Sequence, residues 1–482
     1  MDRTILLVNA NRMRPPIGPL ALDYLGDRLR DEGYHVTLFD LAMDPPESLS
    51  DRLDAIDPLL VGLSFRNTDD CFLPSGDWFV PAFCELVAAV RSRTDARIVV
   101  GGCGYSIFPA EILALCGADY GITGDSEDTL TLLADHLARR RDPHDLPGLV
   151  WRDKKGTVTV NPPTYRDQLD VSPRRSLIDN VRYFRQGGMG NVETKRGCPA
   201  PCIYCADPVA RGRQVRSRKP ASVADEIETL LDRDVDVLHL CDGEFNIPPD
   251  HALAVCEAII ARGLGKRIRW YCYAACAPFD AELAVAMRRA GCVGINFGAD
   301  SGCDRMLHTL RRGYTREDVA RAVRCCRDAG ITVMLDLLIG GPGENRDSVT
   351  ETIALCKRLA PDRVGAATGI RLYPATPLAQ AVRFQGPLAS NPNLRGAVTD
   401  NDDLLQPIFF LSEQLGDDPN GLVCDLIAGD ERFFPPPRVQ DATNYNYNDN
   451  APLENAIAAG YRGAYWDILR RLASSDPMNR EP

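Results

Sequence analysis

The sequence of 482 residues lacks a surplus of basic residues, and it also lacks any long apolar run. Its 55 Lys and Arg residues are outnumbered by 67 Asp and Glu residues, which gives a formal net charge of −12. Nucleic-acid-binding proteins need excess positive charge to neutralise phosphates, so this class of protein is disfavoured. No stretch of about 18 apolar residues occurs, so we expect no membrane-spanning helix and no membrane partner.

We expect no secretory signal either. The apolar run at residues 5–8 is too short for one and is typical of a first β-strand. We therefore expect a cytoplasmic protein whose 17 cysteines are reduced, most of them as small buried side chains. The length suggests about two to four domains, and a hydrophobic content of 45% with 25% charged residues is ordinary for globular proteins.

Residues 1–140 show the pattern of a parallel α/β sheet. Apolar runs lie at 4–8, 35–39, 59–64, 97–102 and 119–123, and helical patterns lie between them at 20–32, 79–91, 109–115 and 129–137. Continuous apolar strands alternating with helices predict a Rossmann-like, doubly wound domain with helices on both faces. Ligands of such sheets bind beyond the carboxyl ends of the strands. No GxGxxG follows the first strand, so dinucleotide binding has little support.

The strand ends of this domain carry unusual residues. Arg66, in the segment SFRN, leaves a buried strand and must find a partner or a ligand. An ion pair with Asp69 or Asp70 is the simplest partner for it. Gly101, Gly102 and Gly104, in the segment GGCGYS, would let a ligand approach the backbone closely, although a tight turn explains them equally well.

A cysteine motif follows in the segment NVETKRGCPAPCIYCADP. Cys198, Cys202 and Cys205 form the pattern CxxxCxxC in a loop that three prolines keep from becoming helical. Three thiolates at this spacing can bind three irons of a [4Fe–4S] cluster and leave the fourth iron open. A structural zinc site would need four ligands, and no fourth Cys or His lies nearby in the sequence.

This motif, with Tyr204 before its last cysteine, resembles the signature of the radical S-adenosylmethionine (radical SAM) superfamily. The resemblance implies a [4Fe–4S] cluster, SAM, and a partial (βα)6 TIM-like barrel over residues 190–390. Strands are expected at 190–195, 235–241, 267–273, 292–297, 331–338 and 364–372.

The resemblance also implies SAM contacts at three strand ends. Asp242-Gly243-Glu244 is similar to the GGE motif of the superfamily, so Gly243 and Glu244 should meet the methionine amino group. Asp300 and Ser301 should hold the ribose, and Gly340 and Gly341 in LLIGGPGE should lie beside the adenine. Tyr204 is expected near the same cofactor. The order of the three motifs behind the cysteines argues against coincidence.

A doubly wound domain before such a barrel resembles the cobalamin-dependent radical SAM family, and within it the tryptophan 2-C-methyltransferase type. A DxHxxG motif is absent, because Asp142-Pro143-His144 lies in the connecting segment with one residue too many before Gly148. The resemblance implies that Arg66 and Asn67 lie below the corrin ring, where a guanidinium cannot coordinate cobalt. It places Gly101, Gly102, Gly104 and Gly124 among the cobalamin contacts.

The other segments are less informative. Residues 141–189 are expected to connect the domains, with a strand in 146–153, and 391–482 to form a C-terminal segment that serves as a substrate lid, with a helix at 453–472. Tyr445 and Tyr447 would belong to that lid. Arg371 and Tyr373 end the sixth barrel strand and are expected to act catalytically on the substrate. Arg311 and Arg312 are most simply solvated charges, and one of Cys325 and Cys326 should be core.

We therefore expect a cobalamin-dependent radical SAM methyltransferase. It would transfer a methyl group from SAM through methylcobalamin to an unactivated carbon, or a phosphinate phosphorus, of a small-molecule or peptide substrate. An electron donor such as flavodoxin or ferredoxin would serve it. The alternative is an enzyme with the same cofactors that catalyses a non-methylating cyclisation, rearrangement or oxidation. A non-catalytic iron–sulfur or corrinoid sensor would not need three SAM-contact motifs.

Overall fold

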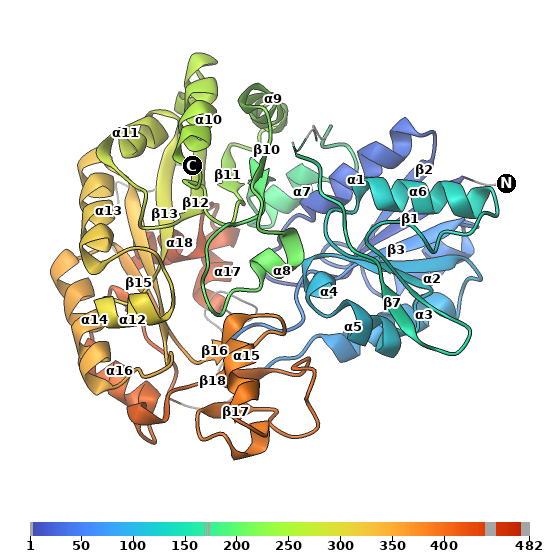
Figure 1. Cartoon of the computed structure of the whole chain (residues 1–482). Helices are drawn as coiled ribbons and strands as arrows, with labels where there is room; N and C mark the ends of the chain where they lie inside the picture. The colour runs from blue at the N-terminus through green and yellow to red at the C-terminus, as the bar shows by residue number, and fades with distance from the viewer. Residues whose placement is uncertain (1–2, 168, 170, 172–173, 439–449, 474–482) are drawn as a thin grey trace.

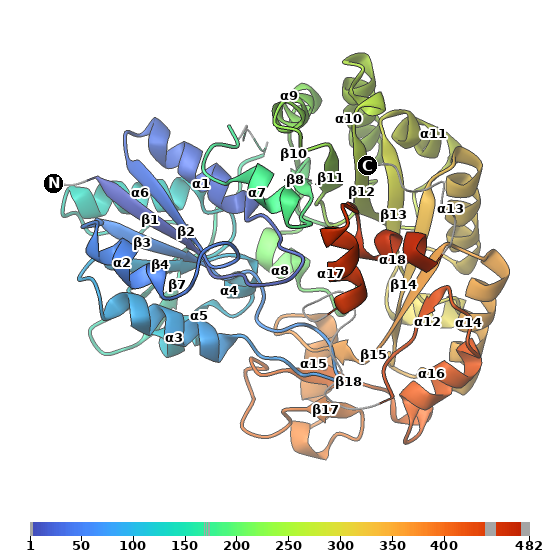
Figure 2. The ribbon, with the colours of Figure 1, turned by 180° about the vertical axis from the view of Figure 1, so that it is seen from behind.

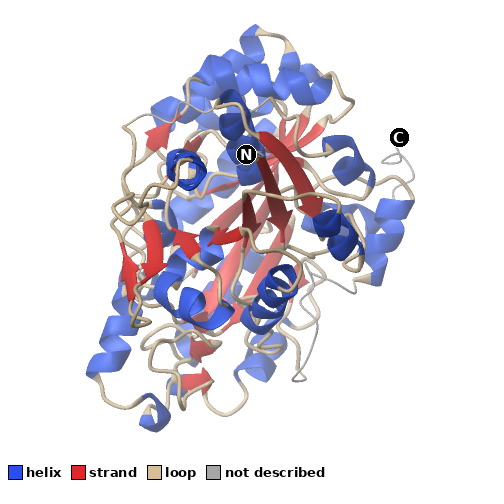
Figure 3. Cartoon of the chain, turned by 90° about the vertical axis from the view of Figure 1, so that its right-hand side faces the viewer, coloured by secondary structure: helices blue, strands red, loops and turns tan. Residues whose placement is uncertain are grey.

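The structure, a computed structural model, describes residues 3–167, 169, 171, 174–438 and 450–473. Two α/β bodies lie side by side, the first built from the N-terminal third of the chain and the second from most of the remainder (Figures 1 and 2). Each body has its own parallel sheet covered by helices (Figure 3). The expected fold class is confirmed. No helix among the described residues is long and apolar enough to cross a membrane.

The first sheet has the strand order β2-β1-β3-β4-β5-β6-β7 within the described residues, and its first five strands are parallel. Apolar side chains of α1 and α6 pack on one face of this sheet, and those of α3 and α5 pack on the other. The elements of this body are β1 (Thr4–Asn9), α1 (Leu20–Asp31), β2 (His35–Asp40), α2 (Ser48–Asp54), β3 (Leu60–Ser64), α3 (Val80–Arg91), β4 (Arg97–Gly101), α4 (Cys103–Ile107), α5 (Pro109–Cys116), β5 (Tyr120–Ile122), α6 (Glu127–Ala138), β6 (Leu149–Arg152) and β7 (Val158–Val160).

The first sheet extends past residue 140, where the sequence analysis ended the domain. Strand β6 pairs antiparallel with β5, and β7 pairs antiparallel with β6, so part of the expected connector belongs to the sheet. A hairpin at a sheet edge needs no crossover helix, and the alternation of strands and helices that marked the domain therefore stopped before it. The remaining connector contains only α7 (Asn180–Arg185) as regular structure among its described residues.

The second sheet is an open, parallel barrel with the strand order β19-β15-β14-β13-β12-β11-β8 within the described residues. All six expected strands are present, and β19 adds an unexpected seventh beside β15. The strands are β8 (Gly190–Val192), β11 (Val237–Leu240), β12 (Arg269–Ala274), β13 (Cys292–Asp300), β14 (Thr332–Ile339), β15 (Arg363–Thr368) and β19 (Phe433–Phe434). The helices of this body are α8 (Asp207–Arg211), α9 (Pro220–Leu231), α10 (Pro249–Ala261), η1 (Leu264–Lys266), α11 (Ala281–Arg289), α12 (Asp304–Thr309), α13 (Arg316–Ala329), α14 (Arg346–Leu359) and α16 (Pro419–Ile427).

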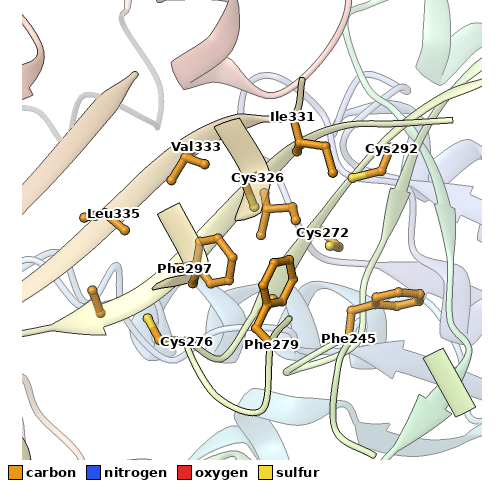
Figure 4. Packing of buried hydrophobic residues seen from close by; sticks show 14 of the residues in the cluster. Phe245, Cys272, Cys276, Phe279, Cys292, Phe297, Cys326, Ile331, Val333 and Leu335 are labelled. Carbon is orange, nitrogen blue, oxygen red and sulfur yellow. The ribbon is translucent and has the colours of Figure 1, made fainter. Parts of the chain in front are cut away.

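The main hydrophobic core lies between this barrel and its outer helices. Six cysteines contribute to it, and Figure 4 shows four of them, Cys272, Cys276, Cys292 and Cys326, among aromatic and aliphatic side chains. All 17 cysteines are free thiols, and Cys326 is buried whereas its neighbour Cys325 is half-buried. The expectation that most of them are ordinary core residues without disulfides is therefore confirmed.

The described residues after 370 are packed against the barrel and do not form a separate tail. A small antiparallel sheet joins β16 (Ile370–Arg371), β18 (Ile408–Phe410) and β17 (Leu394–Gly396), beside α15 (Pro377–Phe384), η2 (Leu388–Ser390) and η3 (Glu413–Leu415). A short two-stranded ladder of β9 (Lys195–Arg196) and β10 (Arg216–Ser217) flanks the cysteine loop. The expected lid residues Tyr445 and Tyr447 lie outside the described residues.

The helix expected at 453–472 is two helices, α17 (Ala451–Ala458) and α18 (Tyr465–Ala473). Gly463 between them has a φ of +134°, and an added Cβ would lie 2.6 Å from the hydroxyl of Tyr271, so the chain turns there. Helix α18 then packs under the barrel, where Trp466 meets Tyr271 and Met334. In Figure 2, α17 and α18 lie in front of the barrel strands.

Candidate functional site

The cysteine loop is held against the barrel by Asp242, which stands where the GGE motif of the superfamily has its first glycine. The buried carboxylate of Asp242 accepts hydrogen bonds from the backbone amides of Thr194 and Lys195, at 2.8 and 3.2 Å, and binds the ammonium of Lys195 at 2.8 Å. Burial opposes ionisation of this carboxyl, but Lys195 and Thr194 outweigh it and lower its pKa. Asp242 therefore anchors the strand that leads to the cysteines.

The three cysteines of the motif lie close enough to influence one another. Burial raises the pKa of each thiol, and the neighbouring thiols add to the rise for Cys205, whose pKa reaches about 12. No three ligand side chains converge on one ion position among the described residues. A four-iron cluster does not require such convergence, because each thiolate binds a different iron. The donor set of three neighbouring thiols fits the cluster.

Arg312, which was expected to be a solvated charge, lies inside the site. Its side chain is only 6% exposed, so it is not a solvated charge. Its guanidinium donates to the sulfur of Cys202 at 2.8 Å, pairs with Asp300 at 3.1 Å and lies 3.6 Å from Glu244. It thus joins a cluster cysteine to both acidic residues of the expected SAM site. A turn between two helices hides this role, because nothing in the local sequence distinguishes Arg312 from the exposed Arg311.

The expected SAM acids lie together around Arg312. Tyr204 donates a short hydrogen bond to Asp300, which has a left-handed backbone with φ of +58°. Burial raises the pKa of Glu244 to about 7, although Arg312 opposes the rise. Gly243 lies next to Asp207, the first residue of α8. An added Cβ on Gly243 would lie 3.4 Å from the carboxylate of Asp207. The structure therefore brings Tyr204, Gly243, Glu244 and Asp300 to the mouth of the barrel.

The other residues that were expected to contact SAM form hydrogen bonds with neighbouring groups of the protein. The hydroxyl of Ser301 is buried 2.9 Å from that of Thr352, so its expected ribose contact is not supported. The backbone amides of Gly340 and Gly341 both donate to the carboxylate of Glu344, at 2.6 and 3.0 Å. These bonds fold the glycine segment into a fixed turn, and the amides are not free for a ligand.

Arg66 reaches from the first body toward the barrel. Its side chain is exposed and forms no ion pair with any described residue, and its closest polar contact is the sulfur of Met13 at 3.3 Å. The simple pairing with Asp69 or Asp70 is wrong, because Asp69 pairs with Arg371 and Asp70 binds Ser75. Burial lowers the pKa of His239 inside the barrel to about 4, and the charge of Arg66 adds to this fall. The same charge opposes the rise that burial causes in the pKa of Tyr273.

The glycines of the first body support the Arg66 segment. An added Cβ on Gly102 would lie 2.5 Å from the carbonyl of Phe65, and one on Gly104 would lie 3.0 Å from the backbone of Arg66. Glycine is required here because two backbone segments meet. Gly101 ends β4, and Gly124 packs against Pro163 and Tyr165. Asn67, beside Arg66, faces the same Met13 sulfur at 3.9 Å.

Arg371 and Tyr373 join the two bodies. Among the described residues, their contacts are structural and do not indicate a catalytic role. The buried guanidinium of Arg371 pairs with Asp69 at 2.9 Å and donates to the carbonyls of Leu404 and Leu405, both at 3.1 Å. The hydroxyl of Tyr373 lies 2.9 Å from the sulfur of Cys71. Both side chains therefore fix the loop after β3 that carries Arg66.

Four side chains inside the barrel were missed from sequence. They are His239, Tyr273, Asn296 and Asp336, from four adjacent strands. His239 and Tyr273 form an edge-to-face ring pair at 5.2 Å, and Asn296 donates to Asp336 at 2.7 Å. Their signal was the alternation along each strand, since polar residues at inward positions of a parallel barrel interrupt an otherwise apolar run.

The histidine beside the connector is structural, as expected. His144 stacks on Trp151 at a ring distance of 4.0 Å and lies 2.8 Å from Asp142. The strand ends of the first body thus offer Arg66, Asn67 and backbone to a corrin ring, and no histidine among the described residues there. This donor set fits a cobalamin that lacks a protein ligand below the cobalt.

Comparisons with known proteins agree with these sites. Residues 192–356 match the radical SAM superfamily, and residues 7–134 match the B12 binding domain. The tryptophan 2-C-methyltransferase of Streptomyces laurentii is 29% identical over 96% of this chain and 95% of its own. The cytidylyl-2-hydroxyethylphosphonate methyltransferase of Streptomyces wedmorensis is 24% identical over 69% of this chain and 71% of its own.

A solved structure agrees over nearly the whole chain. The radical SAM methyltransferase TsrM from Kitasatospora setae, with tryptophan and the SAM analogue aza-SAM bound, is 31% identical, with a TM-score of 0.91 over 98% of this chain and all of that chain. A second structure of that enzyme, with cobalamin and a [4Fe–4S] cluster bound, has a TM-score of 0.88. The chain therefore belongs to the cobalamin-dependent radical SAM methyltransferases, whose cofactors are a [4Fe–4S] cluster, SAM and cobalamin.

Proposed function

We propose that this enzyme methylates an electron-rich sp² carbon of a small aromatic substrate, such as the indole ring of tryptophan. The observation that carries the proposal is Arg66, an exposed cation at the exit of β3 that no described carboxylate neutralises. The relatives named for tryptophan methylation support the choice of ring. An electron-rich ring carbon can accept a methyl group directly, so no hydrogen atom has to be removed from it first.

In this proposal the cofactors supply the transferable methyl group and a metal to carry it. Arg66 contributes a charge that cannot coordinate cobalt, because a guanidinium has no acceptor atom. Arg66 would thus line the cobalamin site without supplying a metal ligand, and the bound cofactor would carry the methyl group that SAM provides. Asn67 and the backbone of Gly102 and Gly104 would form the rest of that surface.

The other residues would position the second cofactor and the cluster. Cys198, Cys202 and Cys205 would bind the irons, and Glu244 with Gly243 would receive the amino group of SAM. Asp300, oriented by Tyr204 and Arg312, would hold the ribose, and the turn of Gly340 and Gly341 would lie beside the adenine. A small reduced electron carrier, flavodoxin or ferredoxin, would keep the metal centres active.

The test uses the protein reconstituted with iron, sulfide and cobalamin, supplied with SAM and L-tryptophan. Mass spectrometry should detect tryptophan that carries one added methyl group. The variant Arg66→His places an acceptor nitrogen at the same position, and we expect its methylation rate to fall about tenfold or more, with a shifted visible spectrum of the bound cobalamin. Arg66→Lys keeps a cation without an acceptor atom and is the matched control.

The outcomes separate the parts of the proposal. If Arg66→His methylates as fast as Arg66→Lys, the role of the unpaired cation is wrong. If the wild-type protein turns over SAM but adds no methyl group to tryptophan, indole or their ring-substituted analogues, the aromatic substrate class is wrong.

A further inference from the structure

The barrel interior contains an unpaired carboxylate beside an unpaired amide oxygen. Asp336 on β14 receives one hydrogen bond, from the side-chain nitrogen of Asn296 at 2.7 Å, and forms no ion pair with any described residue. Asn296 on β13 is only 5% exposed, and its side-chain oxygen has no hydrogen-bond partner. Buried acceptors of this kind are normally satisfied, so the pair is set up to receive donors.

The surroundings of Asp336 supply no positive charge. The charged group that acts on it is Asp300, which adds to the effect of burial and raises the pKa of Asp336 to about 6. Burial raises the pKa of neighbouring Tyr273, and the charge of Asp336 adds to this rise. A half-buried carboxylate without a cation is unfavourable, and a bound cation would relieve it.

The positions of Asp336 and Asn296 indicate which kind of cation would bind there. Asp336 pairs in register with Gly298, two residues before Asp300 at the end of β13, so the pair lies deeper in the barrel than the expected SAM acids. Two acceptors side by side suit a group with several N–H donors, and a primary ammonium has three. A ring N–H offers only one donor. Tyr273, 45% exposed and stacked edge-on to His239, presents an aromatic wall beside them.

We propose that Asp336 and Asn296 form a subsite for the ammonium group of the substrate. The substrate of this enzyme is then an aromatic amine or amino acid, with its ring toward Tyr273 and the first body and its ammonium at the floor of the barrel. This inference rests on the proposed function and specifies its substrate class.

The experiment measures binding of three indole compounds to the reconstituted, SAM-loaded enzyme by calorimetry. L-Tryptophan and tryptamine carry the ammonium, whereas indole-3-propionate lacks it. The variant Asp336→Asn keeps the size and the hydrogen-bonding shape but removes the charge. We expect its dissociation constants for both amines to rise about tenfold to hundredfold, and that for indole-3-propionate to stay unchanged. The same substitution at the exposed Asp347 is the control.

Each outcome bears on a different statement. If indole-3-propionate binds the wild-type enzyme as tightly as tryptamine and is methylated, the proposed function stands and the ammonium subsite is wrong. If neither amine binds the wild-type enzyme, the subsite is wrong as well, whatever the substrate. If Asp336→Asn weakens SAM binding and leaves tryptamine binding intact, the carboxylate serves the cofactor and the inference fails.

Discussion

At the scale of single residues, Arg312 connects more of the site than any other side chain described above. It contacts Cys202, Asp300 and Glu244 at once. We expect Arg312→Met to weaken SAM binding by about tenfold to hundredfold, because it removes a cation that favours the ionised forms of Asp300 and Glu244 against the effect of burial. The pKa of Glu244, about 7 with Arg312 in place, would rise further and leave this group neutral at pH 7.

Calorimetric titration with SAM and an iron determination on the reconstituted protein check this prediction. The matched control is Arg311→Met, since Arg311 precedes it and is exposed. Equal SAM affinities in the two variants would show that Arg312 only fills space.

The pH dependence of substrate binding follows from Asp336. Its pKa is raised from 3.8 to about 6, so the carboxylate is charged above pH 6 and becomes neutral as the pH falls below it. Asn296, Tyr273 and Asp300 face it, and the ammonium of tryptamine keeps its charge throughout this range. We therefore expect the affinity for tryptamine to fall as the pH is lowered from 7 to 5, when measured by calorimetry. In Asp336→Asn the fall should disappear, and a fall of the same size there would assign it to another group.

At the scale of elements, the loop after β3 is fixed by an ion pair between the two bodies. Asp69 and Arg371 are both buried, and their side chains are 2.9 Å apart. Removing one member leaves the other buried without its partner, so we expect Arg371→Met to lower the free energy of unfolding by about 3–5 kcal/mol. Because the same loop carries Arg66, cobalamin should also bind more weakly.

Urea unfolding and a cobalamin titration measure the two effects. Arg438→Met breaks an exposed pair with Asp425 and should change the unfolding free energy by less than about 1 kcal/mol. A loss of stability in Arg371→Met no larger than in this control would refute the role of the pair.

The elements also show what the sequence could and could not predict. Barrel strands β11 to β14 were predictable because each is a largely apolar run followed by a helix. Strand β19 has only two residues, Phe433 and Phe434, and no periodicity can mark so short an element. The framework contacts of Arg371 and Ser301 could not be predicted, for another reason. Position at a strand end is a local property, whereas their partners Asp69 and Thr352 are set by tertiary contacts.

At the scale of the whole molecule, buried charges hold the two bodies together. Asp125 and Glu127 of the first body pair with Arg196 of the barrel, at 3.2 and 2.7 Å, and Arg216 lies 3.1 Å from Asp125. Buried pairs are screened little by salt, so this interface should persist at high ionic strength. The double variant Asp125→Asn with Glu127→Gln removes both carboxylates while preserving side-chain size.

We expect the double variant to unfold in two thermal transitions, because the arginines of the barrel lose their counter-charges and the bodies uncouple. Differential scanning calorimetry should resolve these transitions, whereas the wild-type protein should show one. The half-exposed neighbour Asp128, changed to Asn, is the control. A single transition in the double variant, at the wild-type temperature, would mean that apolar packing alone couples the bodies.

The position of α18 under the barrel bears on how the protein is made. Tyr271 donates a hydrogen bond of 2.8 Å to Asp467, a residue 196 positions later in the chain. Contacts between segments so far apart form late and slow folding, and they leave apolar surface open while the ribosome is still at work. The barrel base therefore closes only after synthesis has passed residue 473. A nascent chain stalled before that point would expose Tyr271 and Met334 to chaperones.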